Sequence, residues 1–95
     1  MAAYLIADLQ VTNPVAYEEY RGRVPAMIAE HGGRYLVRGG QSEELEGAWQ
    51  PRRMIVLEFP TMVRLQAFYA SAEYAPLKAL RIGASDSRIV AIEGL

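Results

Sequence analysis

Acidic and basic side chains on predicted β-strands are the residues with the clearest capacity for chemistry. Asp8 and Glu58 each follow apolar residues that alternate along a strand, and Arg38 stands just before the pair Gly39-Gly40. Two carboxyl groups that meet in a partly apolar cavity repel, which raises the proton affinity of one, and a neighbouring arginine can hold an anion. We therefore predict Asp8 and Glu58 as acid–base groups beside Arg38. The alternative is that these residues form structural ion pairs, within the chain or across a dimer.

Further residues are expected at the rim of such a site. Gly39 and Gly40 allow the backbone to bend sharply or another group to approach it closely. Trp49 and Tyr74 can close the mouth of a pocket, although packing of a long loop also explains them. His31 is expected at the C-terminal end of a helix, near the cavity rim. There the helix dipole stabilises an imidazolium, which is the alternative to a catalytic role.

Other classes of site lack the residues they need. A single histidine and no cysteine cannot build a typical zinc site, so no metal site is predicted. The glycine pairs match neither a phosphate-binding loop nor a dinucleotide fingerprint, and the predicted chemistry requires no cofactor. Ser71 has no His and Asp nearby that would indicate a catalytic triad, and helix capping explains it.

The elements that must position these residues can be read from hydrophobic periodicity and from capping residues. A strand is expected over 4–11, followed by a helix that begins at Asn13-Pro14 and ends at His31-Gly32. Two strands with a long loop between them follow, over 35–37 and 54–59. Thr61 and Ser71 are expected to cap helices, and a turn over 85–87 to precede a last strand over 88–93. This order predicts a single α+β domain over residues 1–95, with the ferredoxin-like βαββαβ arrangement of a four-stranded antiparallel sheet and helices on one face.

The face of this sheet without helices is predicted to be apolar. Tyr4, Ile6, Met54 and Val56 would all be presented there. A monomer rarely exposes so contiguous an apolar patch. We therefore expect a homodimer in which a second copy covers this face.

Composition restricts the partners. The formal net charge is −1 with acids and bases interspersed, which excludes the basic footprint of a nucleic-acid-binding protein. No apolar run reaches the length needed to cross a membrane, and the first residues read as a strand and not as a signal peptide. A cytoplasmic protein without a membrane partner is expected. Nine of the ten basic residues are arginine, which suits carboxylate or phosphate recognition, although biased codon usage also explains the excess.

Several segments together resemble a known family. The chain is similar to the uncharacterised family called domain of unknown function 1330, over nearly its whole length. The segments that carry the resemblance are Gly32-Gly33-Arg34-Tyr35-Leu36-Val37-Arg38-Gly39-Gly40, Leu45-Glu46-Gly47-Ala48-Trp49, Arg53 to Pro60 and Tyr69-Ala70-Ser71-Ala72-Glu73-Tyr74. The resemblance implies the dimeric α+β barrel superfamily, with two ferredoxin-like protomers packed sheet to sheet and a cavity between sheet and helices. Relatives in that superfamily include small monooxygenases, muconolactone isomerases, heme-binding enzymes and stress-response proteins, so the resemblance implies fold more firmly than function.

Two functions remain open at the level of sequence. The first is binding of a small organic acid near Asp8, Arg38 and Glu58, with isomerase or cofactor-independent oxygenase chemistry by analogy with the superfamily. The second is a non-enzymatic homodimer of the interaction or stress type, in which the same charges only fix geometry. A cavity collapsed around apolar side chains favours the second function, and a polar, solvent-connected pocket favours the first.

Overall fold

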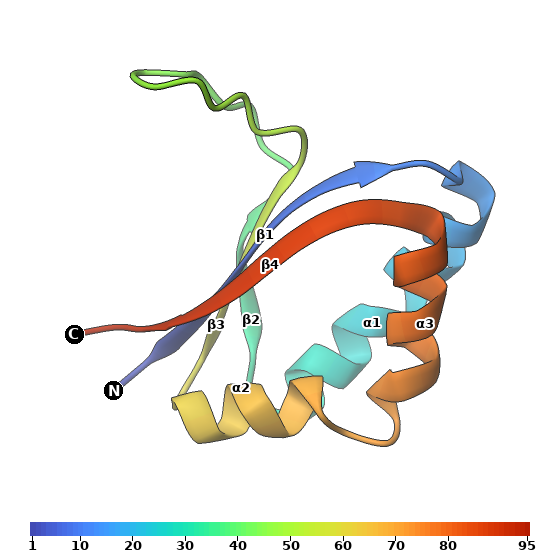
Figure 1. Ribbon diagram of the computed structural model, residues 1–95. Coiled ribbons are helices and arrows are strands. Elements are labelled where there is room, and N and C mark those ends of the chain that lie inside the picture. The colour runs from blue at the N-terminus through green and yellow to red at the C-terminus, as the bar shows by residue number, and fades with distance from the viewer.

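The computed structural model describes residues 1–95 as one four-stranded antiparallel sheet with three helices. The elements in chain order are β1 (Ala3–Val11), α1 (Pro14–Glu30), β2 (Arg34–Arg38), β3 (Met54–Phe59), α2 (Met62–Tyr69), α3 (Tyr74–Ala84) and β4 (Ser85–Glu93). The strand order is β2-β3-β1-β4, which is the predicted ferredoxin-like arrangement with β1 and β3 at the centre. The helices lie on one side of the sheet and the two termini lie close together (Figure 1). No helix is long and apolar enough to cross a membrane.

The predicted capping residues set the helix ends. The Asn13 side chain accepts a hydrogen bond from the Ala16 amide at 3.2 Å, and Pro14 is the first residue of α1. Gly32 ends the same helix with φ +79, the left-handed conformation that favours glycine. The Thr61 hydroxyl accepts from the Arg64 amide at 3.1 Å and caps α2. The Ser71 hydroxyl accepts from the Tyr74 amide at 3.2 Å, but the N-cap residue of α3 is Glu73, whose side chain makes no capping hydrogen bond. Local sequence therefore determines where α1 begins and ends and where α2 begins.

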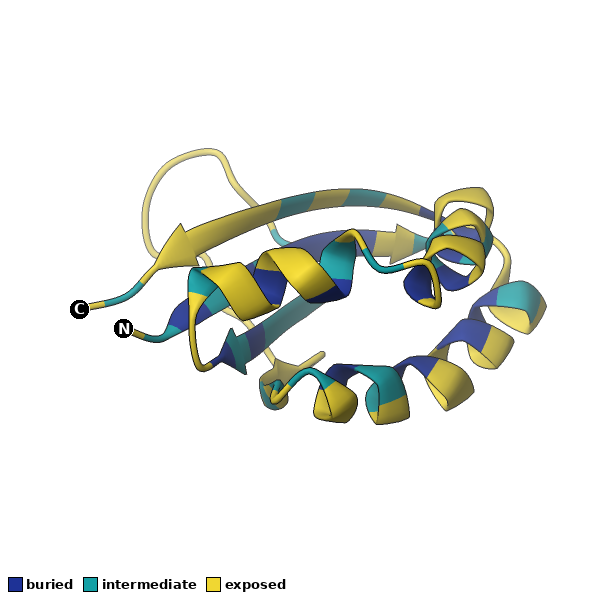
Figure 2. Ribbon diagram, turned by 90° about the horizontal axis from the view of Figure 1, so that it is seen from below, coloured by how far each residue is buried: buried dark blue, intermediate teal, exposed yellow.

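One face of the sheet packs on the helices and forms the core. Leu5, Ala7 and Leu9 of β1 alternate towards the helices, and all three are buried. Phe59 and Phe68 lie beneath them with ring centroids 5.4 Å apart. Figure 2 shows the buried residues of each helix on the side that faces the sheet. This packing leaves room for a cavity between the sheet and α1, α2 and α3.

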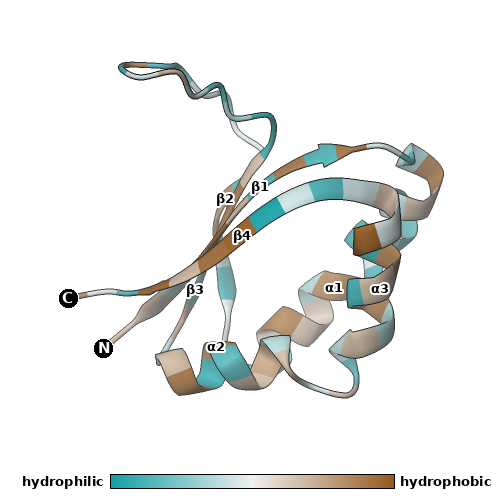
Figure 3. Cartoon of the chain, viewed as in Figure 1, coloured by the Kyte–Doolittle hydropathy of each residue, from teal (hydrophilic) through white to brown (hydrophobic).

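The other face of the sheet is open and largely apolar. Tyr4 and Ile6 of β1 pair with Ile92 and Val90 of β4, which are 54% and 57% exposed. On the opposite side Ile6 pairs with Val56 of β3. Hydrophobic segments are visible along the C-terminal half of β4 in Figure 3. The predicted two-sided apolar character of the central strands is therefore present in the fold.

Two local features differ from simple sequence reading. The predicted turn over 85–87 is wrong, because β4 begins at Ser85, directly after α3. Ser85 and Ser87 pair with Val11 and Leu9, and the Ser85 hydroxyl donates to the Arg81 carbonyl at 2.7 Å. Pairing with β1 satisfies the backbone groups that a turn would have left to solvent. The second feature is an irregularity in β2 between Tyr35 and Val37, where the register with β3 shifts by one residue.

Candidate functional site

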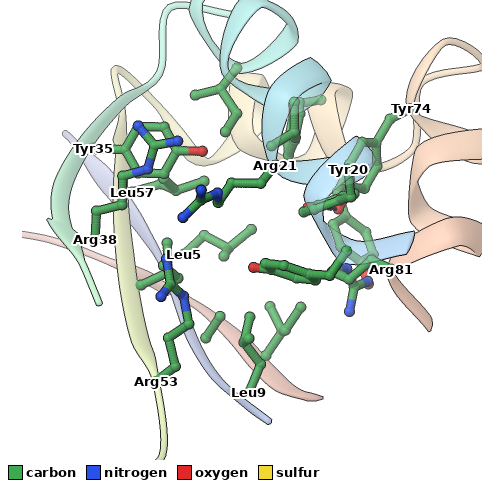
Figure 4. A pocket seen from close by; sticks show the side chains of 18 residues that line it. Leu5, Leu9, Tyr20, Arg21, Tyr35, Arg38, Arg53, Leu57, Tyr74 and Arg81 are labelled. Carbon is green, nitrogen blue, oxygen red and sulfur yellow. Dashed lines mark hydrogen bonds between the residues drawn. The ribbon is translucent and has the colours of Figure 1, made fainter. Parts of the chain in front are cut away.

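A cavity lies between the sheet and the helices. Its volume is about 50 Å³, which is room for a few water-sized groups, since one water needs roughly 10–15 Å³ on this measure. Its apolar wall includes Leu5 and Ala7 of β1, Leu57 of β3, and Val24 and Ile28 of α1. The polar part consists of tyrosine and arginine side chains (Figure 4). These are Tyr17, Tyr20, Tyr35, Tyr69 and Tyr74 together with Arg21, Arg38, Arg53 and Arg81.

The charges that line the cavity are all positive. Four guanidinium groups face it, and no aspartate or glutamate lines it. Arg21 is paired with Glu18 at 2.8 Å, outside the cavity. Arg38, Arg53 and Arg81 form no ion pair. A cavity wall with several arginines and no acidic residue attracts an anion, because the guanidinium group has only hydrogen-bond donors and keeps its positive charge.

The irregularity in β2 places Arg38 at the cavity. Tyr35 lies opposite Leu57 and Arg38 lies opposite Ile55, and both β3 residues line the cavity. Residues three apart on a regular strand point to opposite faces, so the extra residue is what puts Tyr35 and Arg38 on the same side. The Arg38 guanidinium lies over the Tyr35 ring at 4.6 Å from its centroid. Burial raises the pKa of Tyr35, which keeps this phenol neutral.

The backbone at Gly39 makes room for Arg53. Gly39 has φ +70, and a Cβ built there would lie 2.9 Å from the Arg53 guanidinium carbon. The close approach predicted for the glycine pair is therefore made by the Arg53 side chain. Its Nε is buried and has no hydrogen-bond partner. Gly40 has open space around it and does not line the cavity.

Arg81 supplies the most deeply buried charge of the cavity. It lies in the last turn of α3 and is 3% exposed. Its Nη1 donates to the Ser87 hydroxyl at 2.6 Å and its Nη2 to the Tyr69 hydroxyl at 3.4 Å, whereas Nε has no partner. Burial lowers the pKa of Arg81, but interactions with Tyr74 and other tyrosines outweigh that effect and raise it. The guanidinium therefore stays charged without a carboxylate beside it.

Two tyrosine hydroxyls meet beside this arginine. Tyr20 of α1 and Tyr74 of α3 are both buried, and their hydroxyl oxygens lie 2.9 Å apart. Burial raises the pKa of Tyr20, so it is a neutral phenol across the physiological range. Tyr74 was predicted at a pocket mouth, and the structure places it in the cavity wall.

Asp8 lies on the opposite face of the sheet. Its carboxylate accepts from the Arg52 amide at 3.0 Å and from the Trp49 indole Nε1 at 3.2 Å. The Arg52 amide bond, followed by the Trp49 bond and the Arg52 charge, holds the pKa of Asp8 below its usual range despite burial. Asp8 and Trp49 line an open depression of about 490 Å³ on the open face and not the cavity. Both residues therefore anchor the loop between β2 and β3.

Glu58 does not meet Asp8, which corrects the predicted carboxylate pair. Asp8 lies opposite Met54, whereas Glu58 lies opposite Tyr4. Four residues along a strand separate the two positions, about 13 Å. Glu58 accepts from Arg34 Nε at 2.7 Å, on the open face. Its arginine partner is thus Arg34, and Arg38 reaches neither acid.

His31 is placed at the end of α1, as expected, and outside the cavity wall. Its Nδ1 lies 3.0 Å from the Met27 carbonyl oxygen, and its ring meets the Phe68 ring edge-on at 5.7 Å. No group of three or more His, Asp or Glu side chains could hold a metal ion. Of the predicted site residues, the structure brings Arg38 and Tyr74 to one cavity, with Gly39 behind its wall.

Sequence reasoning missed Arg53, Arg81 and Tyr20 as site residues. A signal for Arg81 exists in the sequence, because residues 74, 77, 81 and 84 follow helical spacing and Arg81 takes a position on the buried side of α3. An arginine at such a position requires a polar environment or a ligand. Arg53 lacks a comparable signal, because its contact with the cavity depends on the conformation of Gly39.

Fold and cavity together define a ferredoxin-like α+β protein with a cationic pocket between its sheet and its helices. The chain belongs to the family described as Domain of unknown function (DUF1330), which matches residues 2–95. This agrees with the resemblance read from the sequence. No curated protein matches the chain.

Solved structures share the fold at low sequence identity. A protein of unknown function from Rhodopseudomonas palustris is 16% identical with a TM-score of 0.78, covering 99% of this chain and 82% of that one. SnoaB, a cofactor-independent oxygenase from Streptomyces nogalater, is 14% identical with a TM-score of 0.68, covering 99% and 93%. Rv0793 from Mycobacterium tuberculosis is 18% identical with a TM-score of 0.57, covering 100% and 96%. These neighbours show that the chain shares their fold.

Proposed function

We propose that this protein binds a small organic acid in the cavity between sheet and helices. The observation that carries the proposal is the set of four arginines in a cavity wall that contains no carboxylate. Arg81 is buried and Arg53 is half-buried without a carboxylate partner, whereas Arg21 and Arg38 are exposed. Burying a cation without a partner costs free energy, and a bound anion offsets that cost. A carboxylate fits because its two oxygens match the planar donor fork of arginine.

The cavity restricts the size of the acid. At about 50 Å³ the enclosed space fits a carboxylate with a short carbon chain. A larger aromatic acid requires the tyrosine or arginine side chains of the wall to move apart. Small acids are therefore the first ligands to test.

Chemistry on the bound acid is a further part of the proposal. SnoaB, which has the same fold, is a cofactor-independent oxygenase, and isomerisation or cofactor-independent oxidation was the chemistry expected by analogy. The expected proton carriers Asp8 and Glu58 lie outside the cavity, so the tyrosine hydroxyls of its wall, among them the Tyr20–Tyr74 pair, are the groups within reach of a ligand. A neutral Tyr20 acts as a hydrogen-bond donor to a ligand oxygen and not as a base.

We also propose a homodimer formed through the open face of the sheet. That face carries Tyr4, Ile6 and Val56 on the central strands, next to the exposed Val90 and Ile92. Apolar area of this kind is stabilised when a second copy covers it. Neighbours with the dimeric α+β barrel fold support this arrangement.

A second candidate function is a non-enzymatic homodimer with no ligand. The small cavity volume favours it, since most of the space between sheet and helices is filled by leucine and tyrosine side chains. The unpaired arginines favour ligand binding instead, because a purely structural core has no need of Arg81 at 3% exposure.

A thermal-shift screen against small carboxylic acids separates the two functions. A ligand that binds only the folded protein raises its melting temperature, by an amount that grows with ligand concentration. We expect a saturable rise for at least one acid, and loss of that rise in Arg38→Ala. Arg64→Ala is the matched control, because Arg64 is exposed on α2 and does not line the cavity. No shift with any acid, or an Arg38→Ala protein that responds like the parent, would rule the proposal out.

A further inference from the structure

The end of the cavity at Arg81 contains hydrogen-bond donors that have no acceptor. Arg81 uses Nη1 for Ser87 and Nη2 for Tyr69, and its buried Nε has no partner. An arginine has only donors to offer, so any group that satisfies this nitrogen must be an acceptor. The protein supplies no acceptor to this nitrogen, and no carboxylate lines the cavity.

The Tyr20–Tyr74 pair adds a second free donor at the same end. Only one hydrogen can lie between the two hydroxyl oxygens, 2.9 Å apart. Tyr74 also interacts with the Arg81 guanidinium, but as an acceptor, so neither hydroxyl donates to a further protein group. One O–H hydrogen is therefore left without an acceptor in a buried position. Figure 4 shows Arg81 on the same side of the cavity as Tyr20 and Tyr74. An oxygen placed there could accept from both the guanidinium and a hydroxyl.

The opposite side of the cavity has its own cationic group. Figure 4 shows Arg38 and Arg53 there, away from Arg81. Arg53 Nε is buried without a partner. Arg38 is exposed and forms no ion pair. The apolar side chains of Leu5 and Leu57 line the wall of the same cavity. The cavity thus has two separated positions for an oxyanion, one at Arg81 and one at Arg38 and Arg53, and an apolar wall.

We propose that the ligand of this cavity is a small dicarboxylate, with one carboxylate held by Arg38 and Arg53 and the other by Arg81 with the Tyr20–Tyr74 hydroxyl pair. The inference rests on the proposed function and names its ligand class. Two carboxylates supply the acceptors that both ends lack and offset the unpaired positive charges. The cavity volume of about 50 Å³ favours the shortest dicarboxylates, and side chains of the wall must move apart to admit them.

Isothermal titration calorimetry at constant ionic strength tests the ligand class. Malonate and succinate are compared with acetate and propanoate, so that chain length and charge are varied separately. We expect the better dicarboxylate to bind at least about tenfold more tightly than either monocarboxylate. Arg81→Met should remove this preference, because a dicarboxylate then has only one carboxylate held by the protein, and Arg38→Ala should weaken both classes. Arg64→Met, at an exposed position outside the cavity, should behave like the parent.

A second variant keeps the test decisive if Arg81→Met does not fold. Tyr20→Phe combined with Tyr74→Phe retains both rings and removes the free hydroxyl, and it should lower dicarboxylate affinity selectively. Equal affinity of the parent for dicarboxylates and monocarboxylates overturns the dicarboxylate assignment alone. The dicarboxylate assignment is also overturned if the folded Arg81→Met variant, or the double phenylalanine variant, still binds dicarboxylates more tightly than monocarboxylates. Absence of binding by all four acids overturns the proposed function as well.

Discussion

Asp8 shows how the environment of one residue decides its role. A carboxylate on a central strand was predicted to carry protons, yet in the structure its oxygens are occupied by the Arg52 amide and the Trp49 indole. Donors of this kind stabilise the ionised form, which is the opposite of what an acid–base group near neutral pH requires. Asp8 therefore holds the loop between β2 and β3 against the sheet.

The first prediction concerns the stability that Asp8 supplies through this loop. Its pKa is lowered in the folded protein, so its contribution is present above the unfolded pKa, near 3.9, and is lost as pH falls through the folded value. Asp8→Asn should lower the free energy of unfolding by about 1–2 kcal/mol at pH 7. The difference from the parent should shrink below about pH 4. Urea unfolding followed by fluorescence of Trp49, the single tryptophan, measures both values.

Asp86→Asn is the matched control for this prediction. Asp86 also binds Arg52, at 3.1 Å, but its side chain is 69% exposed. Exposed pairs contribute little, so a change within about 0.5 kcal/mol is expected. A parent–Asp8→Asn difference that stays constant from pH 7 to pH 3 would contradict the role assigned to Asp8.

Residue roles were less predictable from the sequence than residue positions. Arg38 and Tyr74 were predicted as ligand-binding residues, and both line the cavity. The expected meeting of Asp8 with Glu58 depended on strand register, which a single sequence does not reveal. Arg81 was missed because a charged residue is normally expected on the exposed side of a helix, whereas Arg81 lies on the buried side of α3.

At the level of elements, capping residues and hydrophobic periods predicted nearly all of the helices and strands. The bounds expected for the strand over 54–59 and for the end of α1 match the structure. The irregularity in β2 could not be predicted, because regular alternation would have turned Arg38 to the face opposite Tyr35. The start of β4 directly after α3 was also missed. Ser-Asp-Ser is typical of a turn, and residues 85–87 form a strand only because they pair with β1.

The second prediction tests the bend at the end of β2. Gly39→Ala should destabilise the fold by about 1–2 kcal/mol, because alanine resists the left-handed conformation, and its Cβ would collide with the Arg53 guanidinium. Chemical denaturation gives the free energy of unfolding. Gly40→Ala is the control, since nothing lies within 4 Å of a Cβ there and the residue has no positive φ. Equal free energies of unfolding for the two variants would show that the fold does not require glycine at position 39, beside Arg53.

At the level of the whole molecule, the helices cover one face of the sheet and leave the other open. The cavity lies on the covered face, and the apolar residues of the other face are only half-buried on the central strands and exposed on β4. A function that uses the cavity and a dimer that uses the open face can therefore coexist. The two proposals are also separable by mutation.

The third prediction concerns this dimer. Val56→Arg should convert it to a monomer or unfold it, because a charge buried in the interface without a partner costs several kcal/mol. Sedimentation velocity at micromolar concentration gives the oligomeric state. Val63→Arg on α2, where the valine is 73% exposed, should leave that state unchanged. A parent protein that sediments as a stable monomer would contradict the dimer.

The most direct measurement of the central claim follows the side-chain Nε–H signals of the arginines by NMR during titration with a small organic acid. Binding in the cavity predicts saturable shifts of the Arg38, Arg53 and Arg81 signals with a common dissociation constant. The signals of Arg23 and Arg64, which are exposed and outside the cavity, should not follow that curve. Shifts that are absent, or equal for all arginines and linear in acid concentration, would contradict a small-acid site between the sheet and the helices.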